Sequence, residues 1–404
     1  MSLSFFICTY IKSEAEGKNI WYNTEKRFKK EVHIVEVFDF FIYSPILLLF
    51  IFLLIIFGYM RTKRERRMFH VRIEPWNKEV KRGLLQGIVS GFSVSLVLFG
   101  FGVVLPQDYL FALAILLAGM LLIGYSRLLT PAYFLFGAVF VLLLLEDYVE
   151  QVILPNETLL SILLLSTILL FVEALFIQRQ SKRQASPVIQ KTPRGRETST
   201  FEHKQWWLLP VVLLVPGDWF ESFSTFWPVF SIGESSYAFV FFPFVIGTAY
   251  HMKSSYPDAF MQRVSRHVFV LSLFSLIFTM IAYVYPPFSL VGLGLLAVGR
   301  LFINIWNVHQ DRQGNVHQIP EGLTIVSLLP ETAAVDLGLQ VGETIAKVNG
   351  ERVYNEKEFY DALQKNAAHC RLEVIDRNGE LRLIQRVLYA DDHHRLGLVF
   401  MYFK

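Results

Sequence analysis

Residues 330–353 read PETAAVDLGLQVGETIAKVNGERV, and the architecture of the C-terminal part of the chain follows from them. The segment ETAAVDLGL predicts a short helix that ends at Gly338, because glycine commonly follows the last helical residue. The segment VGETIAKVNGERV predicts two strands joined by Asn349-Gly350, a dipeptide typical of tight hairpin turns. A short helix followed by a hairpin indicates a small α+β module.

The flanking residues extend this pattern in both directions. Residues 322–330 (GLTIVSLLP) alternate like a strand, and residues 355–366 predict a helix with Asn355 as its N-cap. Residues 370–388 predict two strands around a second Asn-Gly turn, and residues 395–403 (RLGLVFMYF) predict a last strand.

This order of elements resembles the bacterial PDZ family over about 80 to 100 residues. The family carries a carboxylate-binding loop of Gly-Leu-Gly-Phe type before its ligand-binding strand. Here the only match is Leu396-Gly397-Leu398, near the C-terminal end. The resemblance therefore implies a circularly permuted module whose ligand-binding strand is residues 398–403.

The resemblance also implies where a peptide would bind. A peptide adds as a strand to an open sheet edge, and glycine lets the loop turn its N–H groups toward a terminal carboxylate. The residues expected to form the site are Arg395, Leu396, Gly397, Leu398, Val399 and Phe400, with Glu356, Tyr360 and Leu363 on the facing helix. Phe359 and Ala362 are expected to face the core. Two alternatives stay open: an edge strand that only packs on the core, and an internal segment as ligand in place of a free C-terminus.

The residues before the module predict a polytopic α-helical membrane domain. Hydrophobic residues make up 53% of the chain and charged residues 18%, with 37 Phe. The chain contains several apolar runs of 17 residues or more, and each is long enough to cross a hydrocarbon core as a helix. Nine crossings are predicted: 40–60, 83–105, 109–127, 131–149, 157–177, 205–222, 236–252, 267–285 and 288–306. The sixth contains Pro210 and Pro216 and could instead be a re-entrant element.

The charges of the loops predict the orientation of these crossings. Residues 61–82 hold nine basic and three acidic residues, and the segments 178–204 and 253–266 are also basic. Residues 146–157 and 216–236 hold acidic residues and no Lys or Arg. Since cytoplasmic loops retain Lys and Arg, the N-terminus is expected outside the cell and the C-terminus in the cytoplasm. The segment 61–82 could also contact anionic membrane lipids.

The domain organisation follows from these patterns. Residues 1–39 are a polar tail, either flexible or an artefact of the assigned start; residues 40–306 are the membrane domain, with a mobile basic linker at 178–204; residues 320–404 are the cytoplasmic PDZ-like domain. Residues 305–404 carry a net charge of −3, which argues against a nucleic-acid partner.

No pattern of catalytic residues is present in the sequence. There is no His-Glu-x-x-His zinc motif, no serine in a glycine-rich context with a partner histidine, and no phosphate loop. The two cysteines, Cys8 and Cys370, support neither a disulfide framework nor a metal site. We therefore predict no catalytic, cofactor or metal site. Two intramembrane carboxylates, Glu173 and Asp218, are candidates for a polar role, and Glu173 is expected to pair with Arg179 or reach the interface.

The multi-span anchor, the basic stretch RTKRERRMFHVRI after the first span and the C-terminal PDZ module together resemble the MinJ family of cell-division topological determinants, from about Val37 onward. The resemblance implies a non-enzymatic adaptor at septa and poles that connects a DivIVA-like polar scaffold to MinD, which holds the inhibitor MinC at the membrane. Other membrane proteins of the divisome and a second copy of the chain are further expected partners. The alternatives are a PDZ-containing membrane regulator or protease, and a transporter with an accessory module.

Overall fold

The computed structural model describes residues 45–69, 73–145, 154–181, 185–191, 197–217, 229–232, 235–313, 322–330, 332–365, 369–387 and 396–400. Expectations from the sequence that concern residues outside these ranges include the polar tail 1–39, Asp218, Arg395 and residues 401–403 of the predicted last strand.

Five of the described helices are long and apolar enough to cross a membrane, as expected of a multi-pass membrane protein. They are α3 (Pro45–Phe69), α4 (Trp76–Gly100), α7 (Asn156–Ser181), α9 (Pro257–Val284) and α10 (Phe288–Gln313). Two shorter apolar helices, α5 (Gln107–Ile123) and α6 (Pro131–Leu145), pack beside them.

The sixth and seventh predicted crossings, 205–222 and 236–252, are not helices over their described residues, 205–217 and 236–252. Their places are taken by two long strands, β2 (Glu197–Pro216) and β4 (Ser235–Met252), which pair antiparallel from Phe201↔Met252 to Pro216↔Tyr237. An apolar run by itself does not distinguish a buried strand from a helix. β4 is rich in Phe, Val and Ile, which are enriched in strands. Both segments also contain proline, which disfavours a helix because it lacks the N–H that a helix needs.

Two short strands complete a four-stranded sheet of order β1-β2-β4-β3. They are β1 (Ser186–Lys191) and β3 (Val229–Ile232). The described residues of the predicted mobile linker 178–204 therefore form regular structure: α7 continues to Ser181, and β1 pairs with the start of β2. Backbone pairing along this segment outweighs its polar composition, which had suggested a coil.

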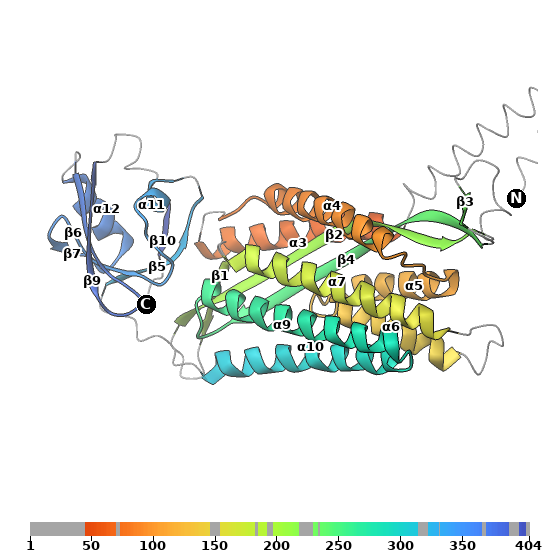
Figure 1. Ribbon diagram of the computed structural model, residues 1–404. Coiled ribbons are helices and arrows are strands. Elements are labelled where there is room, and N and C mark those ends of the chain that lie inside the picture. The colour runs from red at the N-terminus through yellow and green to blue at the C-terminus, as the bar shows by residue number, and fades with distance from the viewer. Residues whose placement is uncertain are drawn as a thin grey trace, which may run out of the picture.

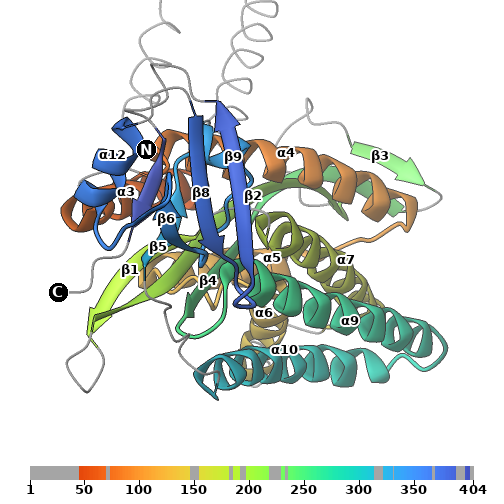
Figure 2. The same ribbon diagram turned by 90° about the vertical axis from the view of Figure 1, so that its left-hand side faces the viewer.

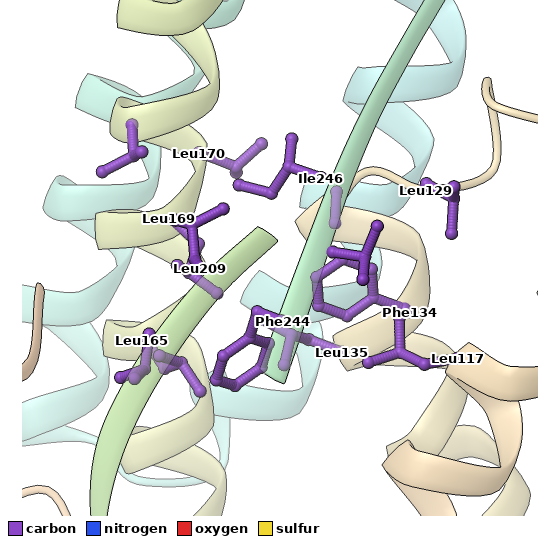
Figure 3. Packing of buried hydrophobic residues seen from close by; sticks show 14 of the residues in the cluster. Leu117, Leu129, Phe134, Leu135, Leu165, Leu169, Leu170, Leu209, Phe244 and Ile246 are labelled. Carbon is purple, nitrogen blue, oxygen red and sulfur yellow. The ribbon is translucent and has the colours of Figure 1, made fainter. Parts of the chain in front are cut away.

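The hairpin of β2 and β4 runs through the middle of the helical bundle (Figure 1). Leu209 of β2 and Phe244 and Ile246 of β4 lie among leucines of α7 and side chains of α6 (Figure 3), and all three are fully buried. Non-helical backbone is tolerated at membrane depth only where protein surrounds it, and this packing meets that condition.

One outer edge of the hairpin is covered by α4. Three glycines of α4, spaced four residues apart, face β2, and a Cβ on any of them would come within 2.5 Å of a β2 carbonyl oxygen: Gly83, Gly87 and Gly91. The stripe continues in Ser95, whose Oγ accepts the N–H of Val212 at 2.8 Å. Small residues thus let the helix lie directly on the strand backbone, as they do between membrane helices.

The other edge is covered by the segment between α5 and α6. The N–H of Gly247 donates to the carbonyl of Leu129 at 2.7 Å, and Nε of Arg127 donates to the carbonyl of Ala249 at 2.9 Å. Pro210 and Pro243 lie opposite each other in the hairpin. Proline lacks an N–H, so it leaves no donor unpaired at such a position.

The C-terminal module forms a separate sheet of order β10-β5-β6-β8-β9, with β7 paired to β6. Its elements are β5 (Leu323–Leu328), α11 (Ala333–Asp336), β6 (Thr344–Val348), β7 (Glu351–Arg352), α12 (Glu356–Gln364), β8 (His369–Ile375), β9 (Leu381–Val387) and β10 (Leu398–Phe400). The helical membrane domain followed by this α+β PDZ-like domain confirms the predicted fold class.

The module lies at one end of the membrane domain, beyond the ends of α3, α7 and α10 and the start of α9 (Figures 1 and 2). Its own core lies between this sheet and the helices α11 and α12 and contains Phe359, Leu363 and Phe400. The bundle core, by contrast, is built from the helices and the β2–β4 hairpin.

Candidate functional site: the β10 edge and a buried polar cluster

The strand β10 forms one edge of the described sheet of the module. It pairs antiparallel with β5, in the register Leu398↔Leu328 and Val399↔Ser327. An edge strand presents backbone donors and acceptors on its unpaired side, which is the feature that peptide-binding modules use. The two neighbouring side chains Leu398 and Phe400 point into the core of the module, where they are 6% and 2% exposed.

Gly397 has the conformation that a carboxylate-binding loop requires. Its φ is +77°, and a Cβ at this position would lie 2.2 Å from Oγ1 of Thr332. Both the backbone and the space therefore require glycine. This explains why a glycine occurs at the only position where the sequence matched the loop of the family.

The carbonyl groups of the loop point inward. The N–H of Leu329 donates to the carbonyl of Gly397 at 2.7 Å, and the N–H of Ala334 donates to the carbonyl of Leu396 at 3.0 Å. In a trans peptide the following N–H points opposite to the carbonyl. The N–H groups of Gly397 and Leu398 are thus directed away from the 329–334 segment, as a bound carboxylate or an added strand needs.

The helix α12 lies above this strand and is fixed at its start by a side-chain cap. The Asn355 side chain accepts the N–H of Glu358 at 2.9 Å. Phe359 and Ala362 are buried, as predicted, and the Phe359 ring lies 5.0 Å from that of Phe400. The third predicted groove residue, Leu363, is also buried at 0% exposure and belongs to the core.

The placement of Leu363 is a correction to the helical-spacing argument. Positions i, i+4 and i+7 lie on one face of a helix, but only the first two, Glu356 and Tyr360, keep exposed surface here, because the face at Leu363 is turned into the core. Burial raises the pKa of the Glu356 carboxyl, and burial together with the nearby Glu356 raises the pKa of the Tyr360 hydroxyl. The groove side of α12 thus offers one partly desolvated carboxyl group beside an aromatic ring.

The predicted strand residues have a second feature that the sequence did not indicate. Val399, between Leu398 and Phe400, points to the opposite face of the sheet. There it packs with Val326 and with the partly buried Leu329 and Phe69, and it is 6% exposed. Phe69 is the last residue of α3, so the membrane domain contacts the proposed ligand-binding strand.

A buried polar cluster in the bundle is the second candidate site. Glu173 of α7 pairs with Arg300 of α10 at 2.7 Å, and both side chains are at most 3% exposed. The hydroxyl of Thr130 donates to Glu173 at 2.7 Å, and Arg300 donates to the hydroxyl of Tyr250 at 3.1 Å. The expected partner of Glu173, Arg179, was wrong, because Glu173 faces the bundle and its cation comes from a helix far along the chain.

The cluster joins four elements, since Arg300 also donates to Asn304, whose amide donates to the hydroxyl of Tyr133 on α6 at 3.2 Å. Of this ion pair, only the carboxylate of Glu173 was predicted from the sequence to be an intramembrane charge. Arg300 could have been found by the same criterion, because it lies within the predicted ninth crossing. In the part of the chain that the structure describes, no group of three or more His, Cys, Asp or Glu side chains could hold a metal ion.

Together, the apolar helices and the C-terminal sheet define a multi-pass membrane protein that carries a PDZ-like domain. No family model matches the chain. It is 29% identical to the cell division topological determinant MinJ of Bacillus subtilis over 383 residues, which cover 92% of this chain and 95% of that protein. It is 27% identical to the probable MinJ of Lacticaseibacillus paracasei, over 85% of this chain and 91% of that one.

The chain is therefore similar to MinJ along most of its length, which confirms the resemblance predicted from the sequence. Among solved structures, the PDZ domain of an SdrC-like protein from Listeria monocytogenes is similar to 21% of the chain, with 15% identity, a TM-score of 0.18 and 94% of that domain covered.

Proposed function

We propose that the chain is a non-enzymatic membrane adaptor in division-site selection, which connects a DivIVA-like polar scaffold to the MinC/MinD inhibitor and uses its PDZ-like domain to bind one of these proteins. The names of the two relatives support a role as a topological determinant of cell division. The proposal places the chain at septa and poles with the module in the cytoplasm, where it also contacts lipids and other division proteins.

The observation that carries the binding role is the geometry of the β10 edge. An edge strand preceded by a glycine at φ +77° directs two successive N–H groups away from the 329–334 segment. Strand addition needs only this backbone, so no reacting group is required. We place the peptide between β10 and the exposed residues of α12.

Localisation and recruitment test the proposal directly. A fluorescent fusion of the full chain is expected at septa and poles, and deletion is expected to produce minicells or filaments. A diffuse membrane signal together with normal division would contradict the adaptor role. Recruitment of MinD and of the scaffold would be measured by co-localisation in the same cells.

Two variants test the groove itself. Gly397→Asp is expected to abolish recruitment of one partner, because its side chain collides with Thr332 and adds a negative charge at the loop. Gly379→Asp is the matched control, since Gly379 also has a positive φ but has open space around it. Glu356→Lys changes only the surface of α12 and keeps the core, so loss of recruitment in this variant is not caused by unfolding. If recruitment survives both Gly397→Asp and Glu356→Lys, the groove is not the contact site.

The buried Glu173–Arg300 pair is the one observation that would favour a transporter, because intramembrane charges often mark a solute pathway. Solute binding would appear as a rise in the melting temperature of the full-length chain with one member of a panel of metabolites. The Glu173→Gln variant would not show this rise. We favour a structural clamp, because the cluster bridges four elements through hydrogen bonds.

A further inference from the structure

The turn between β4 and α9 is built as a rigid platform at the module's end of the bundle. The carboxylate of Asp311, near the end of α10, accepts three consecutive backbone N–H groups, from Lys253 at 2.7 Å, Ser254 at 3.2 Å and Ser255 at 2.8 Å. Asp311 is 2% exposed, so this contact is shielded from water. The next residue, Tyr256, is held in a fixed place by these bonds.

The module rests on this platform through the turn between β8 and β9. The guanidinium of Arg377 lies 4.2 Å from the centre of the Tyr256 ring and pairs with Asp258 at 2.8 Å. Its Nε also donates to the carbonyl of Val341 at 2.8 Å. One arginine therefore makes a cation–π contact and an ion pair across the two domains, while its hydrogen bond to Val341 lies within the module.

Gly342 completes the contact with Tyr256. Its φ is +94°, and a Cβ there would lie 2.0 Å from the Tyr256 ring, so only glycine lets the ring approach. The neighbouring Val341 packs against the core of the membrane domain. Val341 and Gly342 belong to the segment PETAAVDLGLQVGETIAKVNGERV. The PDZ resemblance accounts for the turn at these two residues, but it does not account for their contact with the membrane domain at Tyr256.

The interface is nevertheless small. A cavity of about 350 Å³ remains between the module and the membrane domain, lined by Ser181, Phe201, Gln262, Leu328 and Leu339 among others. The side chains of Arg377 and Asp258 are 21% and 42% exposed. Interfaces of limited area between domains of one chain commonly open and close.

A further contact between the domains is made beside β10, at the end of α3. Phe69 packs against the cluster of Val326 and Val399, on the face of the sheet to which Val399 points. A peptide added to β10 would direct every second side chain to that face, because side chains alternate along a strand. The end of α3 and an added peptide therefore compete for space beside Val399.

We propose that the Tyr256–Asp258 platform and Phe69 form a docking surface for the chain's own PDZ-like module, and that the docked module is autoinhibited because Phe69 packs beside Val399 of β10. Release of Arg377 from the platform frees the strand for its ligand. This inference rests on the proposed peptide-binding role of β10, but the test below needs no ligand and so can fail separately.

The test measures how fast a cysteine at position 399 reacts with a charged maleimide, in the full-length chain in lipid nanodiscs. The background carries Cys8→Ser, and the slow reaction of the buried Cys370 is measured in the parent without Val399→Cys. Arg377→Glu and Asp258→Arg are each expected to raise the rate about fivefold, the size expected of one partly exposed ion pair with a cation–π contact. The double variant, which restores an ion pair of reversed polarity, is expected to bring the rate back toward that of the unaltered chain.

Two controls separate docking from unfolding. Leu383→Cys, at an exposed position of β9, is expected to react at one rate in all backgrounds. Lys365→Glu breaks the exposed Lys365–Glu351 pair within the module and is expected to leave the rate at position 399 unchanged. The proposal is overturned if Val399→Cys reacts as fast as Leu383→Cys in the unaltered chain, if neither charge reversal raises its rate, or if the double variant stays as fast as the single ones.

Discussion

At the scale of single residues, glycine determines how closely this chain packs. Gly83, Gly87 and Gly91 bring α4 onto the carbonyl oxygens of β2, and Gly397 shapes the loop before β10. The spacing of four along α4 places the three glycines on one face of the helix. Successive outward-facing carbonyls of a strand are nearly 7 Å apart, and four helical residues rise about 6 Å, so the two repeats stay in step over this length.

Gly87→Ala is expected to destabilise the membrane domain by about 1–3 kcal/mol, the usual range for overpacking. The added Cβ would lie 1.8 Å from the carbonyl oxygen of Leu208, and a strand backbone cannot yield as a flexible side chain can. The measurement is thermal unfolding of the full chain fused to a fluorescent protein in detergent.

Gly119→Ala on α5 is the control for this substitution. No atom lies within 4 Å of a Cβ at this position. Alanine also has the higher helix propensity, by up to about 1 kcal/mol. Equal melting temperatures for the two variants would show that α4 does not rest on β2 through this glycine.

At the scale of elements, a strand hairpin inside a helical bundle has to satisfy its outer backbone groups. Ser95 of α4 and the carbonyl of Leu129 accept N–H groups from opposite edges of the hairpin. The cluster of Glu173 and Arg300 then ties β4 to α6, α7 and α10 through Tyr250 of β4 and Tyr133 of α6. Each contact satisfies a polar group that would find no water in the bilayer core.

Glu173→Gln is expected to cost about 3–5 kcal/mol of stability, because it leaves Arg300 buried without its counter-charge. The matched control is Glu351→Gln, which removes one charge of an exposed pair and is expected to cost less than about 1 kcal/mol. Both are compared by the same thermal unfolding assay. A melting temperature of Glu173→Gln close to that of Glu351→Gln would contradict the role of the cluster as a clamp.

At the scale of the whole molecule, the basic segments gather at the end that carries the module. The last turns of α3 and α7 and the start of β2 lie there, as do the turn at Lys253 and the last turn of α10 (Figure 1). The turn between α9 and α10, which holds no charged residue, lies at the other end. This distribution supports the orientation proposed from the loop charges, with the module in the cytoplasm.

Cysteine labelling of intact cells tests that orientation. Pro287→Cys, in the α9–α10 turn, is expected to react with a membrane-impermeant maleimide added outside the cell. Arg312→Cys, exposed near the end of α10, is expected to react only after the membrane is permeabilised. The reverse pattern would place the module outside the cell, which is incompatible with the binding to MinD that we propose.

Much of the site could be predicted from the sequence because its signals are local. The glycine before β10, the Asn355 cap and the two Asn-Gly turns each depend on neighbouring residues. Leu363 could not be placed in this way, since its burial depends on how α12 tilts over β10. Phe69 was equally out of reach, because it comes from α3, more than 300 residues away from β10 along the chain.

By itself, the sequence determined that this protein has an apolar multi-span part, a PDZ-like module after it, and a similarity to MinJ. Hydrophobicity, turn residues and similarity to relatives are properties of contiguous residues, so they can be read along the chain. Only the tertiary structure decided that two of the apolar runs are strands, that Glu173 meets Arg300, and that the module rests on Tyr256. These depend on which distant segment satisfies a buried backbone group or charge, and that choice is made only when the elements pack.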